Sequence, residues 1–282
     1  MKQRFALLLT VFICFIIPGF GQDQPFYFVM LTDPQFGMYE SDKGFSRETA
    51  NYEFAIATVN RLKPAFVIIL GDLVNKTGDS DQIHEFQRIS REIDPSVPVH
   101  YVAGNHDVGH EPTPQTLDAY RQSIGRDYYS FRAGPIYGIV LDSTLIHAPQ
   151  KVEAEYQEQI SWLKRELETA KQSGSQHIIV FQHHPYFLNE PQEPDQFGNI
   201  ALERRRTMLA LLHSYNVHYV FAGHIHKNAI GRDGELEMTA TGPVGMPFGD
   251  EGSGIRLAAV TATGVQHRYY NFGRMPDRLE IK

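Results

Sequence analysis

Five short segments that carry metal-binding side chains constrain this chain more than any other feature. In order, they are Thr32-Asp33-Pro34-Gln35, Gly71-Asp72, Gly104-Asn105-His106-Asp107, His183-His184-Pro185 and Gly223-His224-Ile225-His226. Most of them directly follow a run of apolar, β-branched residues, which is typical of a buried strand. Because open α/β sheets place their ligands at strand ends, we expect these side chains to meet at one edge. Carboxylate, amide and imidazole groups at one point indicate a metal site, and two shared metals suit phosphate-ester chemistry.

The segments between the motifs alternate between strand and helix patterns. Strands are predicted at residues 26–31, 66–70, 97–102, 177–181 and 218–221. Helices are predicted at residues 48–62, 81–93, 152–171 and 201–213. The repeated strand–helix–strand order implies parallel strands with right-handed crossovers. We therefore predict an α/β fold with four layers, α/β/β/α, in which two mixed central sheets face each other and helices flank them.

The first residues have the pattern of an export signal. Lys2 and Arg4 form a basic start, and residues 5–20 are almost wholly apolar. Gly19 and Gly21 place small residues at positions −3 and −1 of a cut after Gly21. The apolar stretch is short for a membrane-spanning helix. We predict a signal peptide at 1–21, a mature domain at 22–282 without stable membrane insertion, and a secreted or periplasmic location; an uncleaved membrane anchor is the alternative.

Charge and cysteine content narrow the class of protein further. The only cysteine is Cys14, inside the predicted signal, so the mature chain would rely on burial and hydrogen bonding without disulfides. The formal charge is −7, and removal of the signal would make it −9. A nucleic-acid polymer is therefore not an expected partner. The only basic run, residues 204–206, is predicted to be a solvated helix face.

The ordered motifs resemble those of the calcineurin-like metallophosphoesterases. The family pattern is D-x-H, G-D, G-N-H-[DE], an H-x-P-type histidine and G-H-x-H, and the resemblance covers about residues 26 to 271. Within the family, the chain is most similar to the branch of calcineurin-like phosphoesterase domain-containing proteins. The features shared with that branch are Asp-Pro-Gln-Phe-Gly at 33–37, Phe-Gln-His at 181–183, Asn228-Ala229 and the sequence His-Arg-Tyr-Tyr at 267–270.

The resemblance implies a role for each motif residue. Six residues would be metal ligands: Asp33, Asp72, Asn105, His183, His224 and His226. Asp72 would bridge two ions, with Asp33 and His226 on the first and the remaining three on the second. Two such ions lie ~3.5–4 Å apart and clamp the attacking and leaving oxygens, with a bridging hydroxide as the expected nucleophile. His106 would contact the phosphoryl oxygens and protonate the leaving alkoxide, with Asp107 orienting its ring.

One position departs from the family pattern. Gln35 stands where most of the family has a histidine ligand. A glutamine offers one neutral oxygen, which is a harder and weaker ligand than imidazole. The two divalent ions would then come from Mn, Mg, Fe or Zn, with Mn²⁺ or Mg²⁺ favoured over Zn²⁺. Alternatively, Gln35 binds no metal, and the first ion is loose or lost.

These residues together predict a dinuclear, metal-dependent phosphoesterase. The resemblance implies hydrolysis of phosphate monoesters, with phosphoserine or phosphothreonine in proteins and small phosphomonoesters as candidate substrates. The alternatives are a cyclic nucleotide or other phosphodiesterase, and a weakly active binding protein that only Gln35 supports. His183 is the expected ligand because of its spacing to Pro185, and His184 would line the pocket. The loop at 189–199 is a candidate border of the site.

Overall fold

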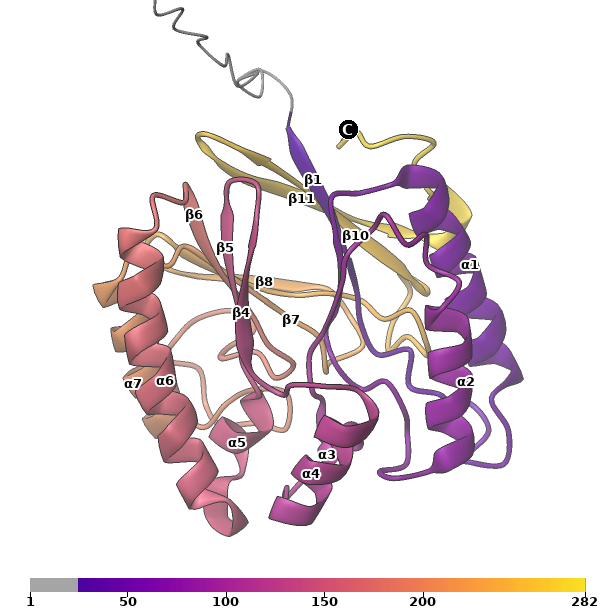
Figure 1. Ribbon diagram of the computed structural model, residues 1–282, viewed down its shortest axis with the longest axis horizontal. Helices are drawn as coiled ribbons and strands as arrows, with labels where there is room; N and C mark the ends of the chain where they lie inside the picture. The colour runs from indigo at the N-terminus through magenta and orange to yellow at the C-terminus, as the bar shows by residue number, and fades with distance from the viewer. Residues whose placement is uncertain (1–24, 282) are drawn as a thin grey trace, which may run out of the picture.

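Two mixed β-sheets face each other at the centre of the fold (Figure 1). The structure is a computed structural model that describes residues 25–281, so the predicted signal peptide lies outside the described residues. The strands of the first sheet, in spatial order, are β11 (Gly264–Asn271), β10 (Gly254–Thr261), β1 (Phe26–Leu31), β2 (Val67–Ile69) and β3 (Val99–Tyr101). Those of the second are β4 (Tyr129–Ala133), β5 (Ile136–Val140), β6 (His177–Phe181), β7 (Tyr219–Ala222), β9 (Leu236–Ala240) and β8 (Ala229–Asp233).

Both sheets combine parallel and antiparallel strand pairs. Strands β1, β2 and β3 are parallel to one another, while β10 pairs antiparallel with both β1 and β11. In the second sheet, β5, β6, β7 and β9 are parallel, and β4 and β8 are antiparallel edge strands. Because β10 is paired with β1, the C-terminal strands complete the first sheet.

Helices cover the outer face of each sheet. The helices after the strands of the first sheet are α1 (Ser46–Leu62), α2 (Ser80–Ser90), α3 (Asn105–Val108) and α4 (Pro114–Ser123). Those of the second half are α5 (Ser143–His147), α6 (Glu153–Gln172) and α7 (Leu202–Ser214). Helices α1 and α2 lie on one side of the sheets and α6 and α7 on the other (Figure 1). The predicted four-layer α/β/β/α fold is confirmed.

An aromatic core joins the two sheets. Phe28 of β1 lies 4.8 Å from Phe66, 5.9 Å from Phe181 of β6 and 6.2 Å from Phe221 of β7, measured between ring centroids. All four side chains are buried, and close aromatic pairs stabilise a core by about 0.5–1.5 kcal/mol beyond the effect of burial. This packing holds β1, β6 and β7 together, and these strands end at the motifs.

The strand ends are also tied to each other through the backbone. The N–H of Asp33 donates to the carbonyl of Gly71, and the N–H of Gln35 donates to the carbonyl of Asp72. In the second sheet, the N–H of Gly223 donates to the carbonyl of His183. Backbone hydrogen bonds alone therefore join the first motif to the second and the fourth motif to the fifth. A separate property of the described residues, 25–281, is that none of their helices has the length and hydropathy of a membrane span.

Asp142 is a buried carboxyl group at the end of β5. Its Oδ1 accepts hydrogen bonds from the N–H and hydroxyl of Thr144 and so caps α5. Its Oδ2 is buried and has no hydrogen-bond partner among the described residues. Burial, together with the nearby Asp127 carboxylate, raises the pKa of Asp142 to about 7. The folded state therefore disfavours the ionised form.

We expect Asp142→Asn to remove a pH-dependent loss of stability. Between about pH 4 and pH 7 the folded wild type keeps a proton on Asp142 that the unfolded chain has released, so wild-type stability falls as pH rises. The stability advantage of the variant should therefore grow by on the order of 3 kcal/mol between pH 4 and pH 8. Urea unfolding of both proteins at a series of pH values measures it. Parallel pH profiles for the two proteins would contradict the assignment.

Candidate metal centre

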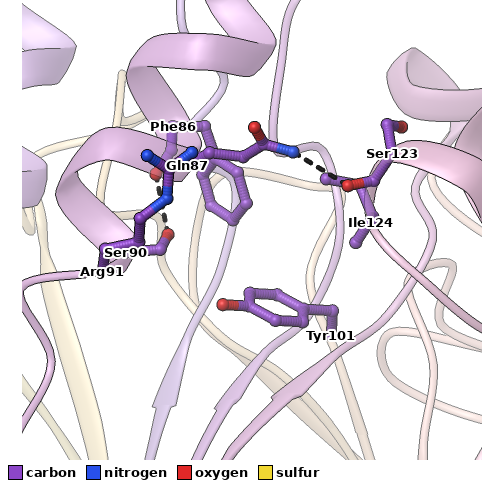
Figure 2. Close-up of a pocket in the computed structure, with 7 residues that line it drawn as sticks. All are labelled: Phe86, Gln87, Ser90, Arg91, Tyr101, Ser123 and Ile124. Carbon is purple, nitrogen blue, oxygen red and sulfur yellow. Dashed lines mark hydrogen bonds between the residues drawn. The ribbon is translucent and has the colours of Figure 1, made fainter. Parts of the chain in front are cut away.

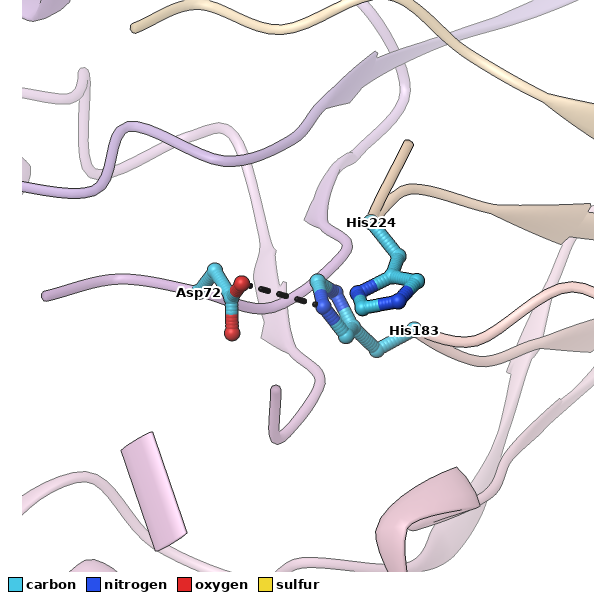
Figure 3. Close-up of side chains that lie close together, drawn as sticks. All are labelled: Asp72, His183 and His224. Atoms are coloured by element: carbon cyan, nitrogen blue, oxygen red, sulfur yellow. Dashed lines mark ion pairs between the residues drawn. The ribbon is translucent and has the colours of Figure 1, made fainter. Parts of the chain in front are cut away.

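The structure brings five of the predicted ligands together in two overlapping groups. Among the described residues, Asp72, His183 and His224 form one group and Asp33, Asp72 and His226 form the other. In each group the ligand atoms lie within 4.8 Å of one another, and every side chain is buried. Figure 3 shows the first group, in which an oxygen of Asp72 lies 3.2 Å from Nε2 of His183. Because Asp72 belongs to both groups, the geometry suits two ions that share one carboxylate.

Asn105 completes the group around His183. It lies at the start of α3, directly after the β3 strand and its connecting turn, and it is buried. Its side-chain Oδ1 lies 3.2 Å from Nε2 of His183. The amide oxygen therefore faces the same point as the imidazole, as expected for a ligand to the second ion.

Backbone carbonyls orient all three imidazoles. Nδ1 of His183 donates to the carbonyl of Leu70 at 2.7 Å, and Nδ1 of His226 donates to the carbonyl of Met246 at 2.5 Å. His224 uses its other nitrogen, because Nε2 donates to the carbonyl of Phe197 at 3.2 Å. A carbonyl can only accept, so each contact places a proton on that nitrogen and leaves the opposite nitrogen as the one that can bind a metal.

Two buried atoms without partners fit the presence of a cation. Nδ1 of His224 and Oε1 of Gln35 are both buried and have no hydrogen-bond partner among the described residues. An unpaired buried polar atom costs about 1–3 kcal/mol, which coordination to an ion would remove. The amide nitrogen of Gln35 donates to Oδ1 of Asn75 at 3.2 Å, so its oxygen is the free end. Gln35 thus fits a neutral oxygen ligand at the first site.

The backbone at the site is held in an uncommon conformation. Nine non-glycine residues within 25–281 have a positive φ, and five of them are predicted ligands. These five are Asp33 (48°), Gln35 (43°), Asp72 (49°), His224 (72°) and His226 (51°). Such conformations cost about 1–3 kcal/mol each and persist where the surrounding structure enforces them, often at functional sites.

Two glycines allow the motif loops to approach the carboxylates closely. A Cβ atom at Gly104 would lie 2.2 Å from the backbone nitrogen and Oδ1 of Asp72. A Cβ atom at Gly223 would lie 1.9 Å from the hydroxyl of Thr32 and 2.7 Å from Oδ2 of Asp33. Any side chain at either position would displace a predicted ligand. The glycines of the motifs therefore make room for the protein's own carboxylates.

Asp72 and His183 stabilise each other as an ion pair. Burial alone would raise the pKa of Asp72, but the adjacent His183 and, more weakly, His106 and His224 hold it well below its usual range. Burial would lower the pKa of His183, yet the Asp72 carboxylate raises it to about 9. The Asp72 carboxylate is therefore ionised, and its partner is the imidazolium of His183, whose Nε2 proton a metal ion would replace.

His106 is held differently from the prediction. Its Nδ1 donates to the carbonyl of Asn75 at 2.5 Å, and its backbone N–H donates to Oδ1 of Asp72 at 2.8 Å. The carboxylate of Asp107 instead accepts from the backbone N–H groups of Leu73 and Gly104, each at 2.8 Å. The predicted contact of Asp107 with the His106 ring is therefore wrong. Asp107 braces the turns that carry Asp72 and Asn105.

His184 lies beside the centre as predicted for a pocket residue. Its ring is 4.4 Å from His224 and 4.6 Å from His147, measured between centroids. Its Nδ1 forms a hydrogen bond with the hydroxyl of Ser143 at 3.0 Å. Burial, reinforced by the neighbouring histidines, lowers the pKa of His184 well below its usual value, so the ring is neutral.

Sequence reasoning missed residues that support the site from a distance. Asn75 contacts both Gln35 and His106, and the only available signal was its position three residues after Asp72.

The prediction of a solvated face at 204–206 is wrong for Arg205, which is fully buried. Its guanidinium donates to the carbonyls of Pro191, Glu193 and Ile200 and so fixes the loop at 189–199.

A separate depression lies between α2 and α4 (Figure 2). Its volume is about 280 Å³, and it is spanned by a hydrogen bond from the amide of Gln87 to the carbonyl of Ser123. The residues that line it are Phe86, Gln87, Ser90, Arg91, Tyr101, Ser123 and Ile124. It contains none of the predicted site residues, and we assign it no part in the chemistry.

Comparison with known proteins places the chain in a family. The model of the calcineurin-like phosphoesterases matches residues 26–228. Human serine/threonine-protein phosphatase CPPED1 is 34% identical over 270 residues, which cover 90% of this chain and 86% of that protein. Purple acid phosphatase 15 from Arabidopsis thaliana is 26% identical over 182 residues, covering 61% of this chain and 32% of that protein.

Solved structures confirm the fold. A dimetal phosphatase from Danio rerio superposes with a TM-score of 0.63 at 16% sequence identity, covering 88% of this chain and 100% of that one. At this identity the likeness concerns the fold alone, while the family follows from the matched model and the CPPED1 relatives. The chain belongs to the calcineurin-like phosphoesterases, a family of enzymes that hydrolyse phosphoric esters at a dinuclear divalent metal centre.

Proposed function

We propose that this chain hydrolyses phosphate monoesters, with phosphoserine, phosphothreonine or small phosphomonoesters as substrates. The observation that carries the proposal is the shared position of Asp72 in two buried ligand groups, with His106 directly beside it. The relatives named serine/threonine-protein phosphatases support a monoester substrate. When bound, two divalent ions would supply charge to the phosphoryl oxygens and acidify the water that attacks phosphorus.

The protein's own groups would bind and orient the ester around those ions. Asp33, Gln35 and His226 would hold the first ion, and Asn105, His183 and His224 the second, with Asp72 shared. Since Nδ1 of His106 is occupied by the carbonyl of Asn75, Nε2 is its free nitrogen. That nitrogen would contact a phosphoryl oxygen and, when the ring is protonated on both nitrogens, would give its proton to the leaving alkoxide.

A paired ester assay tests the reaction. The purified protein with added Mn²⁺ or Mg²⁺ should hydrolyse p-nitrophenyl phosphate faster than bis(p-nitrophenyl) phosphate. Metal content should approach two ions per chain. Hydrolysis of the diester alone would make the protein a phosphodiesterase. Fewer than one ion per chain with no turnover of either ester would leave only a binding protein on this fold.

The choice of metal follows from Gln35. Its free oxygen is a hard, neutral donor, so we propose that Mn²⁺ or Mg²⁺ occupies the first position in preference to Zn²⁺. The second position has two imidazoles and an amide oxygen beside Asp72, a set that accepts several divalent ions. The two positions therefore differ in how firmly they hold a borderline-soft ion.

We expect Gln35→His to shift the first site towards Zn²⁺. Histidine tolerates the positive φ of this position better than most residues, and imidazole suits Zn²⁺. Retention of Zn²⁺ after gel filtration should increase by about tenfold, a change of about 1.4 kcal/mol in binding. Elemental analysis and activity with Mn²⁺ against Zn²⁺ measure the shift. Gln172→His on the exposed face of α6 controls for an added histidine, and equal retention in both variants would contradict a ligand role for Gln35.

We also propose that the protein is exported. The proposal rests on the basic start, the apolar stretch and the small residues before Gln22. Mass spectrometry of the protein recovered from the extracellular or periplasmic fraction should find Gln22 as its first residue. Recovery of the uncut chain from the membrane fraction would support the anchor instead.

A further inference from the structure

Two exposed phenylalanines flank the candidate metal centre. Phe197 is 73% exposed and Phe248 is 48% exposed, which is unusual for large apolar side chains. The ring of Phe197 lies 5.0 Å from that of His224, and the ring of Phe248 lies 4.5 Å from that of His226 at an angle of 19°. Each predicted metal site therefore has one exposed aromatic ring beside one of its histidines.

Two charged side chains, Glu193 and Arg205, hold the loop that carries Phe197 through hydrogen bonds. The carboxylate of Glu193 accepts hydrogen bonds from the backbone N–H groups of Leu188 and Asn189 and from the side chain of Asn199. Arg205 of α7, fully buried, donates to three carbonyls of the same segment. Burial of a charge is costly unless it is paired or hydrogen-bonded, and Nη2 of Arg205 also lies 3.9 Å from the carboxylate of Asp195, so these contacts favour one conformation of the loop. Phe197 is thus presented to solvent from a fixed backbone.

The loop that carries Phe248 is tied to the centre itself. The backbone N–H of Phe248 donates to the carbonyl of His226 at 2.8 Å. Two residues earlier, the carbonyl of Met246 accepts from Nδ1 of His226, and the N–H of Gly245 donates to the carbonyl of Asp33. Both phenylalanines therefore come from loops whose carbonyls orient a predicted ligand, and the backbone that carries each ring is tied to the centre.

Shielding of the histidines from water does not explain why the two phenylalanine rings are exposed to solvent. A ring that only excluded water from an imidazole would itself be buried, whereas Phe197 exposes about three quarters of its surface. The free nitrogens of His224 and His226 face inward, so a bound phosphoryl group would lie between the two sites and its organic group would extend towards solvent. Apolar surface at that position gains free energy when it is covered by an apolar partner.

We propose that Phe197 and Phe248 form a subsite for the organic group of the ester and favour esters of aromatic or other apolar alcohols. This inference rests on the proposed phosphomonoesterase function. The two rings supply contact area and no hydrogen bonds, so a polar alcohol such as glycerol gains nothing from them. The discrimination should appear in KM, since the rings contact a part of the substrate that does not react.

The test compares an aryl and a polar alkyl ester on ring-deletion variants. In Phe197→Ala and Phe248→Ala, the KM for p-nitrophenyl phosphate should increase about tenfold, while the KM for β-glycerol phosphate and the inhibition constant of inorganic phosphate change less than about twofold. Phe197→Leu should recover part of the loss, because it restores apolar area. Phe54→Ala is the matched control. Phe54 is 45% exposed on α1, its ring packs against Phe272, and it has no contact with either ligand group among the ring contacts of the described residues.

The outcomes separate this inference from the proposed function. Equal losses on both esters, or a fall in metal content, would mean that the rings only shield the histidines, and unchanged KM values would remove the subsite. Either result overturns the inference while the wild type still hydrolyses monoesters. Failure of the wild type to hydrolyse any monoester would instead overturn the proposed function.

Discussion

Asp72→Asn should reduce turnover by about 10³-fold and lower the metal content below two ions per chain. Asp72 is the only residue shared by both ligand groups among the described residues, and it is ionised in the buried centre. Asparagine has the same shape but removes the negative charge that offsets two cations. Loss of several kcal/mol of transition-state stabilisation corresponds to this factor, since each 1.36 kcal/mol is tenfold. Elemental analysis and kinetics with a chromogenic monoester measure both effects.

The control for this prediction is Asp142→Asn. Asp142 is also fully buried, but it belongs to neither ligand group and caps a short helix. It should therefore keep both ions and wild-type turnover while changing the pH dependence of stability. If Asp72→Asn retained two ions and full activity, Asp72 would not be a bridging ligand and the dinuclear interpretation would fail.

Much of the fold could be predicted because the sequence carries two consistent signals. Apolar strands such as β1 and β6 end within a few residues of polar motifs, and amphipathic helices separate them. This order permits few topologies, and parallel strands necessarily bring their carboxyl ends to one edge. The short helices α3 and α5 were missed, since four or five residues give no periodic pattern. Arg205 was misjudged because its partners are carbonyls of a loop that no local pattern reveals.

The residues of the candidate site could be predicted from the sequence, but the hydrogen bonds that orient them could not. The motif positions of Asp33, Asp72 and His183 follow from resemblance to the family, and the structure brings them together. The orientation of each imidazole depends on carbonyls that are distant in sequence, such as those of Leu70 for His183 and Met246 for His226. Such contacts arise only after the sheets have packed.

His106→Ala should lower turnover by about 10²–10⁴-fold and leave two ions in place. His106 belongs to neither ligand group, so removal of its ring takes away a proton donor and a phosphoryl contact without removing a ligand. The loss should be larger for β-glycerol phosphate than for p-nitrophenyl phosphate, because p-nitrophenolate departs without needing a proton. His84→Ala, on the exposed face of α2, is the control and should behave as wild type.

The dependence on the leaving group is what distinguishes the roles of His106. If the variant loses the same factor on both esters, His106 binds the phosphoryl oxygens and does not protonate the alkoxide. If its activity is unchanged, the fixed contact between Nδ1 and the carbonyl of Asn75 has only a structural purpose. A loss concentrated on the alkyl ester, with metal content intact, would assign the proton to Nε2, the one nitrogen of this ring that the carbonyl of Asn75 leaves free.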